Sequence, residues 1–259
     1  MKIGINMGAY GALDVEKTIS LMCENGFEAT FMGSESPCLD TYVPMLKKAG
    51  IVCENCHAPF DKINDIWYEG EAGEQMLARL IDGVRACARN GIPTLVVHLS
   101  SGVNAPRIND IGNDRFDRLM AEADRLGVTI AYENQRKLAN LASVLEQYPQ
   151  AGFCWDVGHE ACFTDGREYM PLFGSRTVAL HLQDNHCEFN RDEHLLPYDG
   201  SIDMALAARR IAQSPYQGAI MLEVIRKNSN FYDELTPDEY YRRAAESARR
   251  FAKAVEANQ

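Results

Sequence analysis

The sequence alternates between strand-like and helix-like segments with a period of roughly 30 residues. Such alternation is typical of a parallel sheet whose strands are connected by helices. Eight units in succession predict a closed (β/α)8 barrel, and a doubly wound open sheet is the weaker alternative. The predicted strands are residues 3–8, 28–33, 51–57, 94–99, 128–133, 152–156, 177–182 and 218–224.

Amphipathic helix patterns occupy the segments between these strands. The final helix, 238–257, follows Thr236 as its cap and Pro237 in its first turn. No linker or low-complexity tract interrupts the 259 residues, which predicts one barrel domain over 1–259. The other helices that we expect are 15–25, 74–90, 115–126 and 204–213, and glycines at 26, 50, 91 and 127 are expected to end helices.

Composition restricts the partners and the compartment. The formal net charge of −11 argues against a surface that neutralises many phosphates, and therefore against a nucleic-acid partner. The chain starts directly in a predicted strand, and no apolar run approaches the roughly 20 residues that span a bilayer. We therefore expect a cytoplasmic protein without a membrane segment, whose eight cysteines are reduced. Cys53 and Cys56 lie three apart in a predicted strand and should face opposite sides, which disfavours a zinc or redox pair.

Polar side chains gather on one face of the predicted strands. Successive side chains of a strand alternate between its two faces. In 128–133 the large apolar residues share one face, which leaves Thr129, Ala131 and Glu133 on the other. The same alternation turns these residues inward in the other strands: Asn6, His98, Asp156, His181 and Glu223.

Five strands thus place a metal-capable side chain at their last inward position. In a barrel of this kind, that end of the strands carries the active site. The carboxylates of Glu133, Asp156 and Glu223 would repel one another and would be costly to bury without a cation. The sequence therefore predicts a divalent-metal site at the mouth of the barrel.

At these positions the sequence resembles the xylose isomerase-like barrel superfamily. This superfamily includes sugar isomerases and epimerases, inosose dehydratases and endonuclease IV. The resemblance covers essentially the whole chain. Its motifs stand at 57–60 (HAPF), 97–98 (VH), 132–134 (YEN), 155–159 (WDVGH), 181–185 (HLQDN), 192–194 (DEH) and 222–224 (LEV).

The resemblance implies a metal site in two versions. In the ketose 3-epimerase branch, Glu, Asp, His and Glu hold one divalent ion, for which Mn, Zn, Mg and Co are chemically suitable. The arginine that this branch places shortly after its metal-binding histidine is missing here. In endonuclease IV, further histidines and an aspartate hold a second and a third zinc. The single-ion set corresponds to Glu133, Asp156, His181 and Glu223, and the additional metal or substrate-binding positions are His57, His98, His159, Asp192 and His194.

The resemblance also implies an activity. We expect a sugar isomerase or epimerase in which Glu133 and Glu223 remove and return a proton next to a carbonyl, through a metal-stabilised enediolate. A keto-sugar dehydratase could use the same site. An endonuclease IV-like phosphodiesterase acting on abasic DNA fits the ligand types, but the predicted loops 61–73 and 198–200 are acidic rather than basic. A sugar-binding barrel without catalysis is a further alternative, and any of these proteins could form homo-oligomers.

Other residues near the predicted mouth are candidates for contact with a small sugar substrate. Trp67 is expected in a lid, and Asp184 is expected either to orient His181 or to cap its loop. The segment 186–201 is long for a connection of this kind, which indicates a cover over the site. The substrate-binding candidates are Asn6, Trp67, Asn134, Asp184 and Arg226.

Overall fold

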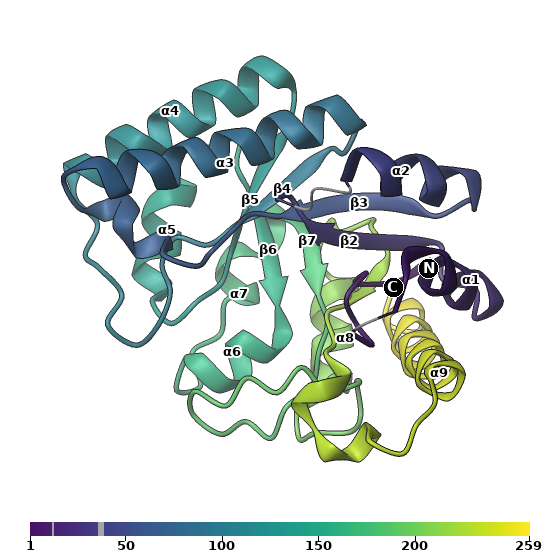
Figure 1. Cartoon of the computed structure of the whole chain (residues 1–259). Helices are drawn as coiled ribbons and strands as arrows, with labels where there is room; N and C mark the ends of the chain where they lie inside the picture. The colour runs from purple at the N-terminus through teal and green to yellow at the C-terminus, as the bar shows by residue number, and fades with distance from the viewer. Residues whose placement is uncertain (12, 36–38) are drawn as a thin grey trace.

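Eight parallel strands form a barrel in the computed structural model, which describes residues 1–11, 13–35 and 39–259 (Figure 1). The hydrogen-bonded order runs from β7 through β6, β5, β4, β3, β2 and β1 to β8. The (β/α)8 prediction is therefore confirmed, and each predicted strand is present. β6 has the predicted bounds, whereas the other strands are shorter than predicted, β1 and β8 most of all. The strands are β1 (Ile3–Ile5), β2 (Ala29–Gly33), β3 (Val52–His57), β4 (Thr94–Val97), β5 (Thr129–Glu133), β6 (Gly152–Asp156), β7 (Thr177–His181) and β8 (Ile220–Leu222).

One residue closes the barrel between β7 and β8. Leu182, directly after β7, pairs with Leu222 in a parallel bridge. The Leu182 N–H donates to the Met221 carbonyl at 2.8 Å, and the Glu223 N–H donates to the Leu182 carbonyl at 3.0 Å. This seam lies at the carboxyl ends of the strands, so it fixes Glu223 relative to His181.

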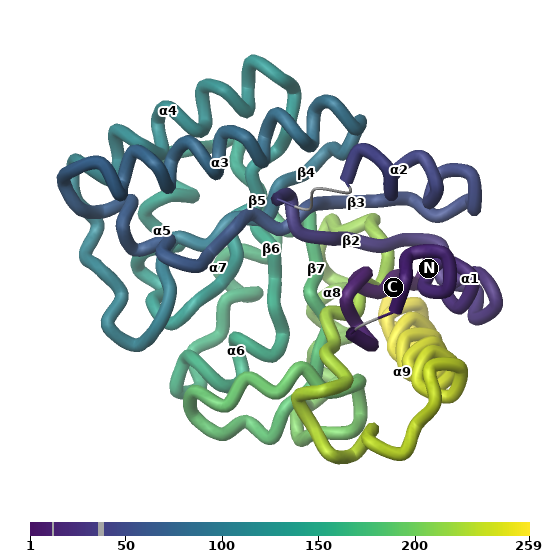
Figure 2. Tube along the Cα trace, in the orientation of Figure 1, coloured from purple at the N-terminus to yellow at the C-terminus, as the bar shows by residue number. Residues whose placement is uncertain are grey.

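Helices surround the barrel, and the chain ends lie close together. In Figure 2, α9 passes beside the N-terminal segment, and the amino group of Met1 forms an ion pair with Glu256. The helices of the described residues are α1 (Val15–Glu24), α2 (Leu39–Lys48), α3 (Glu71–Asn90), α4 (Asp110–Leu126), α5 (Leu138–Gln147), α6 (Val157–Phe163), α7 (Met170–Phe173), α8 (Met204–Ala212) and α9 (Pro237–Glu256). Short 3₁₀ turns cover Ile63–Trp67, Gly174–Arg176, Arg226–Asn228 and Asn230–Tyr232.

The predicted helix ends are largely confirmed. Thr236 caps α9 in a reciprocal capping box with Glu239. The four glycines expected after helices all have positive φ, between 67° and 78°. However, α4 begins five residues before its predicted start because the Asn109 side chain caps it, accepting from the Gly112 N–H at 3.0 Å.

The predicted inner face is also confirmed. Two small clusters of buried residues fill the barrel interior, separate from the large core between strands and helices. Outward-facing residues such as Leu95, Tyr132 and Trp155 belong to the large core. The inner clusters are Val96, Ala131, Cys154 and Ala179, and Ala29, Phe31, Ala219 and Met221.

The prediction that Cys53 and Cys56 face opposite sides is wrong. The pairing of β2 with β3 skips Glu54, since Thr30 pairs with Cys53 and Phe31 with Asn55. This bulge shifts the alternation by one residue, so both thiols join the large outer core. Hydrogen bonds with Cys53 and Cys87, together with burial, raise the pKa of the Cys56 thiol, which favours an unreactive thiol.

None of the helices in the described ranges is long and apolar enough to cross a membrane.

Candidate metal centre

Four side chains meet at the carboxyl ends of neighbouring strands. Glu133 ends β5, Asp156 ends β6, His181 ends β7, and Glu223 follows β8. Each contributes one potential ligand atom, and these atoms all lie within 4.8 Å of one another. The three carboxylates and the imidazole predicted from the strand alternation are therefore brought together.

The metal-capable atoms of this group lack ordinary hydrogen-bond partners. His181 Nδ1 lies 3.2 Å from Glu223 Oε2 and 3.6 Å from Glu133 Oε1, but forms a hydrogen bond with neither oxygen. One oxygen each of Glu133, Asp156 and Glu223 is also buried and unpaired. Such an atom costs about 1–3 kcal/mol, and more when charged. A divalent cation would satisfy all of them at once, and the oxygen and nitrogen donors suit Mn, Zn, Mg or Co.

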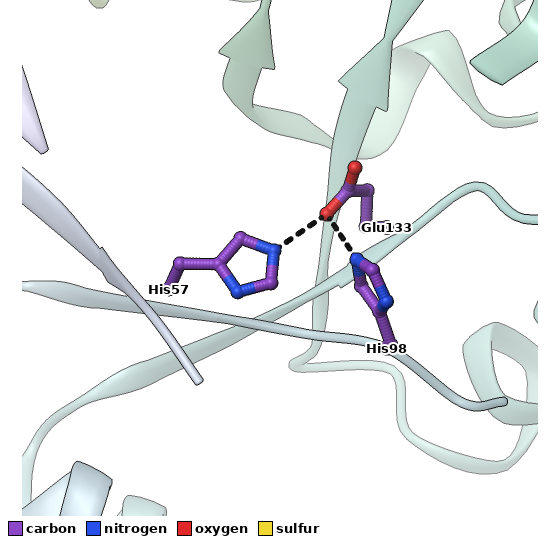
Figure 3. Close-up of side chains that lie close together, drawn as sticks. All are labelled: His57, His98 and Glu133. Atoms are coloured by element: carbon purple, nitrogen blue, oxygen red, sulfur yellow. Dashed lines mark hydrogen bonds and ion pairs between the residues drawn. The ribbon is translucent and has the colours of Figure 1, made fainter. Parts of the chain in front are cut away.

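A second group of potential ligands shares Glu133. His57 Nε2 lies 3.1 Å and His98 Nε2 lies 2.9 Å from Glu133 Oε2. Figure 3 shows both rings directed at this one oxygen. The His57 Nδ1 atom lies 2.7 Å from the Ala58 carbonyl, which fixes the ring so that Nε2 faces the carboxylate.

A third group forms at the edge of the mouth. Asp192 Oδ2 lies 3.2 Å from His159 Nε2 and 3.0 Å from His194 Nε2. His159 belongs to α6, whereas Asp192 and His194 come from the long connection after β7. The segment 186–201 therefore supplies side chains to the mouth. His159 Nδ1 also lies 3.0 Å from Glu133 Oε1, which joins this group to the central one.

Burial and mutual charge shift the pKa values of the cluster in opposite directions. Burial alone would raise the pKa of Glu133, but the charges of His98 and His181 outweigh it and hold that pKa well below its usual value. Burial, with the nearby charges of Glu223 and Glu133, raises the pKa of Asp156 well above its usual value despite the charge of His159. The cluster therefore retains protons among its ligands, and a bound cation would replace them.

Two asparagine side chains position the ligands by bridging neighbouring strands. The Asn134 amide donates to the Asp156 carbonyl and accepts from the Asp156 N–H, each at 2.8 Å. Asn6 makes the same pair of bonds with Val224, at 3.1 and 3.0 Å. Asn134 is fully buried, so its amide links the two strands beside the ligands rather than making the substrate contact expected from the sequence. Asn6 is partly buried and links β1 to the end of β8 in the same way, and its contact with substrate stays a prediction.

Two glutamines without a predicted role hold the outer groups. Gln135 Nε2 lies 3.2 Å from His98 Nε2 and 3.1 Å from His159 Nδ1. Gln183 Nε2 donates to Asp192 Oδ1 at 2.7 Å, and its oxygen accepts from the His194 N–H at 3.1 Å. Gln135 directly follows the motif at 132–134 and Gln183 lies within the motif at 181–185, and these positions are the sequence signal that could have identified them.

The remaining substrate-contact predictions do not fit the structure. Trp67 is no lid: its ring is 1% exposed, packs against Phe116 and donates its N–H to the Leu99 carbonyl at 2.7 Å. Arg226 stacks on Tyr10 and donates to the Asp233 carbonyl at 2.8 Å.

Asp184 organises its own connection instead of binding substrate or His181. Its carboxylate is fully buried and accepts from the backbone N–H groups of Asn185, Tyr198, Gly200 and Ile202 at 2.8–3.1 Å. Of the two alternatives expected for Asp184, the loop-capping one is correct. By fixing the segment 184–202, Asp184 also fixes the place of Asp192 and His194.

The mouth contains a cavity of about 250 Å³, which a second pocket of about 380 Å³ adjoins at His57, Phe60 and Glu223. The cavity is smaller than most pockets for drug-sized ligands, roughly 300–1,000 Å³, and fits a small molecule. Aromatic rings stack on two of its histidines, Phe60 on His98 at 4.8 Å and Phe163 on His159 at 4.7 Å between ring centres. Phe31 stacks in the same way on the fully buried His181, at 4.5 Å.

Fold and site together define a (β/α)8 barrel with a carboxylate–histidine cluster at its mouth, in the place where such barrels carry active sites. The chain belongs to the xylose isomerase-like TIM barrel family, whose pattern matches residues 17–251.

Comparison with individual proteins agrees with this assignment. The uncharacterised protein y4fM of Sinorhizobium fredii is 26% identical over 207 residues, which are 73% of this chain and 63% of that protein. This chain therefore spans less than two thirds of the length of that relative. The D-psicose 3-epimerase of Clostridium cellulolyticum H10, solved with D-tagatose, has a TM-score of 0.80 at 13% identity, covering 98% of this chain and 99% of that one. The IOLI protein, solved with a bound zinc atom, has a TM-score of 0.75 at 15% identity, covering 100% and 99%.

Proposed function

We propose that this protein is a divalent-metal-dependent isomerase or epimerase of a small carbohydrate. The observation that carries the proposal is the set of unpaired, buried ligand atoms of Glu133, Asp156, His181 and Glu223 at a small cavity. Glu133 and Glu223 are two carboxylates within reach of the same small molecule. Barrels of the same fold in D-psicose 3-epimerase and in the zinc-containing IOLI protein support the proposal.

The reaction assigned to the site moves a proton at a carbon next to a carbonyl. Glu133 and Glu223 both line the cavity, so one could remove the proton and the other return it. Their pKa values are held below the usual range despite burial, by His98 and His181 for Glu133 and mainly by His181 for Glu223, so both are ionised and either could remove the proton. The other carboxylate would take up a proton from water before returning one to the substrate carbon. A divalent cation bound here would stabilise the negative charge that develops on the sugar oxygens. His159 and His194 would orient hydroxyl groups.

The same residues could instead eliminate water from a keto-sugar, which makes a dehydratase the nearest alternative. A proton next to the carbonyl is removed in both reactions. The two differ in whether a hydroxyl group then leaves.

A zinc phosphodiesterase is a second candidate, favoured by one specific observation. The groups His57, His98, Glu133 and His159, Asp192, His194 could each hold a further ion beside the central one. Three such ions could serve hydrolysis of a phosphodiester in abasic DNA. The net charge of −11 favours a small-molecule substrate over DNA.

Exchange of substrate hydrogen with solvent tests the proposal directly. Metal-loaded protein is incubated with a panel of ketoses and keto-sugars in deuterium oxide, and NMR follows deuterium at the carbon next to the carbonyl. We expect exchange with at least one sugar, and a loss of at least about 100-fold in Glu133→Gln and Glu223→Gln. Glu35→Gln is a suitable control, because Glu35 lines the adjoining pocket and pairs with Arg79 outside the cluster.

The outcomes separate the candidates. Exchange that ends with loss of water would identify a dehydratase. Incision of abasic DNA without exchange of any sugar would favour the phosphodiesterase. Full exchange in Glu133→Gln would contradict the role of Glu133.

A further inference from the structure

Arg136 lies at the mouth of the metal-site cavity without an anionic partner. It follows β5 by three residues and lines the same cavity of about 250 Å³ as His159, Asp192 and Glu223. Its guanidinium carbon lies 3.6 Å from the centre of the Phe163 ring. Its Nε donates to Asn190 Oδ1 at 2.8 Å. The side chain is therefore held in place from two sides, by α6 and by the connection after β7.

The two terminal nitrogens of Arg136 have no acceptor in the described parts of the chain. Asp192, the acid on the cavity wall whose charge acts on Arg136, is already engaged by His159, His194 and Gln183. Arg191, on the same connection, contrasts with it, because its terminal nitrogens pair with Glu188 and Glu193 at 2.9 Å. The two terminal nitrogens of the Arg136 guanidinium, which form a fork, are thus open to a ligand and held in a fixed orientation.

The positive charge of the Arg136 guanidinium contrasts with the negative charges of the other ionic groups that line the cavity. Among the described residues that line the cavity, Arg136 is the only arginine or lysine, whereas three are carboxylates, namely Glu133, Asp192 and Glu223. Partial burial without an anionic partner lowers the pKa of the Arg136 guanidinium despite the charge of Asp192. A guanidinium with two free nitrogens matches the geometry of a carboxylate or a phosphate, which it binds through two parallel hydrogen bonds.

We propose that Arg136 binds an anionic group of the substrate, so that the substrate is a sugar acid or a sugar phosphate rather than a neutral sugar. This inference rests on the proposed function, since it concerns the cavity that holds the reacting carbons. One end of the molecule would be anchored at Arg136 and Phe163, and its hydroxyl and carbonyl groups would face Glu133 and Glu223.

Three probes that share one carbon skeleton test the proposal: D-fructose, D-fructose 6-phosphate and D-fructuronate. They differ only at carbon 6, which is a hydroxymethyl group in the first, its phosphate ester in the second and a carboxylate in the third. Calorimetric titration of the metal-loaded protein measures the affinity for each. We expect at least one anionic probe to bind about 10- to 100-fold more tightly than D-fructose, and the tighter one identifies the anion.

Variants assign this preference to Arg136. Arg136→Gln should reduce it to within about twofold, and Arg136→Lys should retain part of it, because a lysine keeps the charge but lacks the fork. Arg191→Gln removes a cation from the adjacent connection and should leave the preference unchanged. Circular dichroism and metal content of each variant confirm that fold and metal site are intact.

Two results would overturn the inference alone: equal affinity of the wild-type protein for all three probes, or a preference that persists in Arg136→Gln. Absence of binding by any probe, together with absence of hydrogen exchange for every sugar tested, would overturn the proposed function and this inference with it.

Discussion

Single residues hold the candidate ligands in register through backbone contacts. Asn134 provides the clearest case, since its amide replaces a missing pair of strand hydrogen bonds between β5 and β6. An asparagine side chain carries a donor and an acceptor at the spacing of a peptide group. This pair of bonds therefore fixes Asp156 relative to Glu133, on which any bound metal depends.

Replacement of Asn134 by Ala should weaken metal binding without unfolding the protein. Loss of a side chain that orients metal ligands typically costs 10- to 100-fold in affinity. Competition with a chromogenic chelator measures the change. Asn25→Ala is the control, because among the described residues the Asn25 side-chain amide bonds only the Leu21 carbonyl of the helix that it caps. Unchanged affinity in Asn134→Ala would mean that this pair of bonds does not position the site.

The pH dependence of metal binding follows from the histidine at the edge of the mouth. Burial alone would lower the pKa of His194, but the hydrogen bond to Asp192 and the charge of Glu223 outweigh it and raise this pKa to about 9. At neutral pH the metal-free ring therefore holds a proton, which a cation must displace. Since the raised pKa stabilises the protonated, metal-free form below about pH 9, affinity at His159, Asp192 and His194 should increase with pH up to that value.

Zinc titrations in buffers of different ionisation enthalpy measure the proton release directly. We expect protons to be released on binding, and affinity to rise from about pH 6 to about pH 8. Affinity that falls over this range would contradict the assignment of His194 as a ligand.

At the level of elements, the connection between β7 and α8 packs closely against the start of α6. Gly158 lies beneath the Gln183 side chain, where a Cβ atom would come within 2.2 Å of Gln183 Cδ. Gln183 in turn holds both Asp192 and His194. The glycine of the motif at 155–159 is thus required for close packing and not for a special backbone angle.

A Gly158→Ala change should displace Gln183 and thereby weaken the group formed by His159, Asp192 and His194. In a titration with excess zinc, we expect any binding beyond the first equivalent to be reduced or lost. Gly174→Ala is the matched control, because a methyl group there meets Met170 at an ordinary 3.4 Å. Identical zinc titrations of the two variants would show that the packing of Gly158 against Gln183 does not affect this metal-binding group.

The elements also show what the sequence could predict and what it could not. Strand alternation placed Glu133, Asp156, His181 and Glu223 correctly, since an undisturbed strand turns alternate residues inward. It failed for Cys53 and Cys56, because the bulge at Glu54 depends on pairing with β2, which no local pattern reveals. Trp67 was misplaced for a related reason, because its burial depends on α4, which is distant in sequence.

Other parts of the site depend on contacts that only the folded chain creates. Arg136 had no motif of its own, and its open fork results from the positions of Phe163 and Asn190. The roles of Gln183 and Asp184 also become visible only in the folded chain. Gln183 holds Asp192, whereas Asp184 holds the backbone at Gly200, and both contacts lie on the connection after β7.

At the scale of the whole molecule, the closed barrel is what allows the strand ends to converge. Closure depends on the bridge between Leu182 and Leu222, and the two chain ends meet where Met1 pairs with Glu256. The large core lies between strands and helices, and two small apolar clusters fill the narrow interior, which leaves the mouth above them to hold the polar cluster.

The central claim is that this mouth binds a divalent metal ion, and the metal content of the whole chain tests it most directly. Protein purified without chelator or added metal is analysed by mass spectrometry of its elements, beside Asp156→Asn. The account predicts about one equivalent of Mn, Zn, Mg or Co per wild-type chain and a clear loss in the variant, whereas two or three equivalents of zinc would favour the phosphodiesterase. A wild-type protein that contains no metal and takes up none on dialysis would contradict the account.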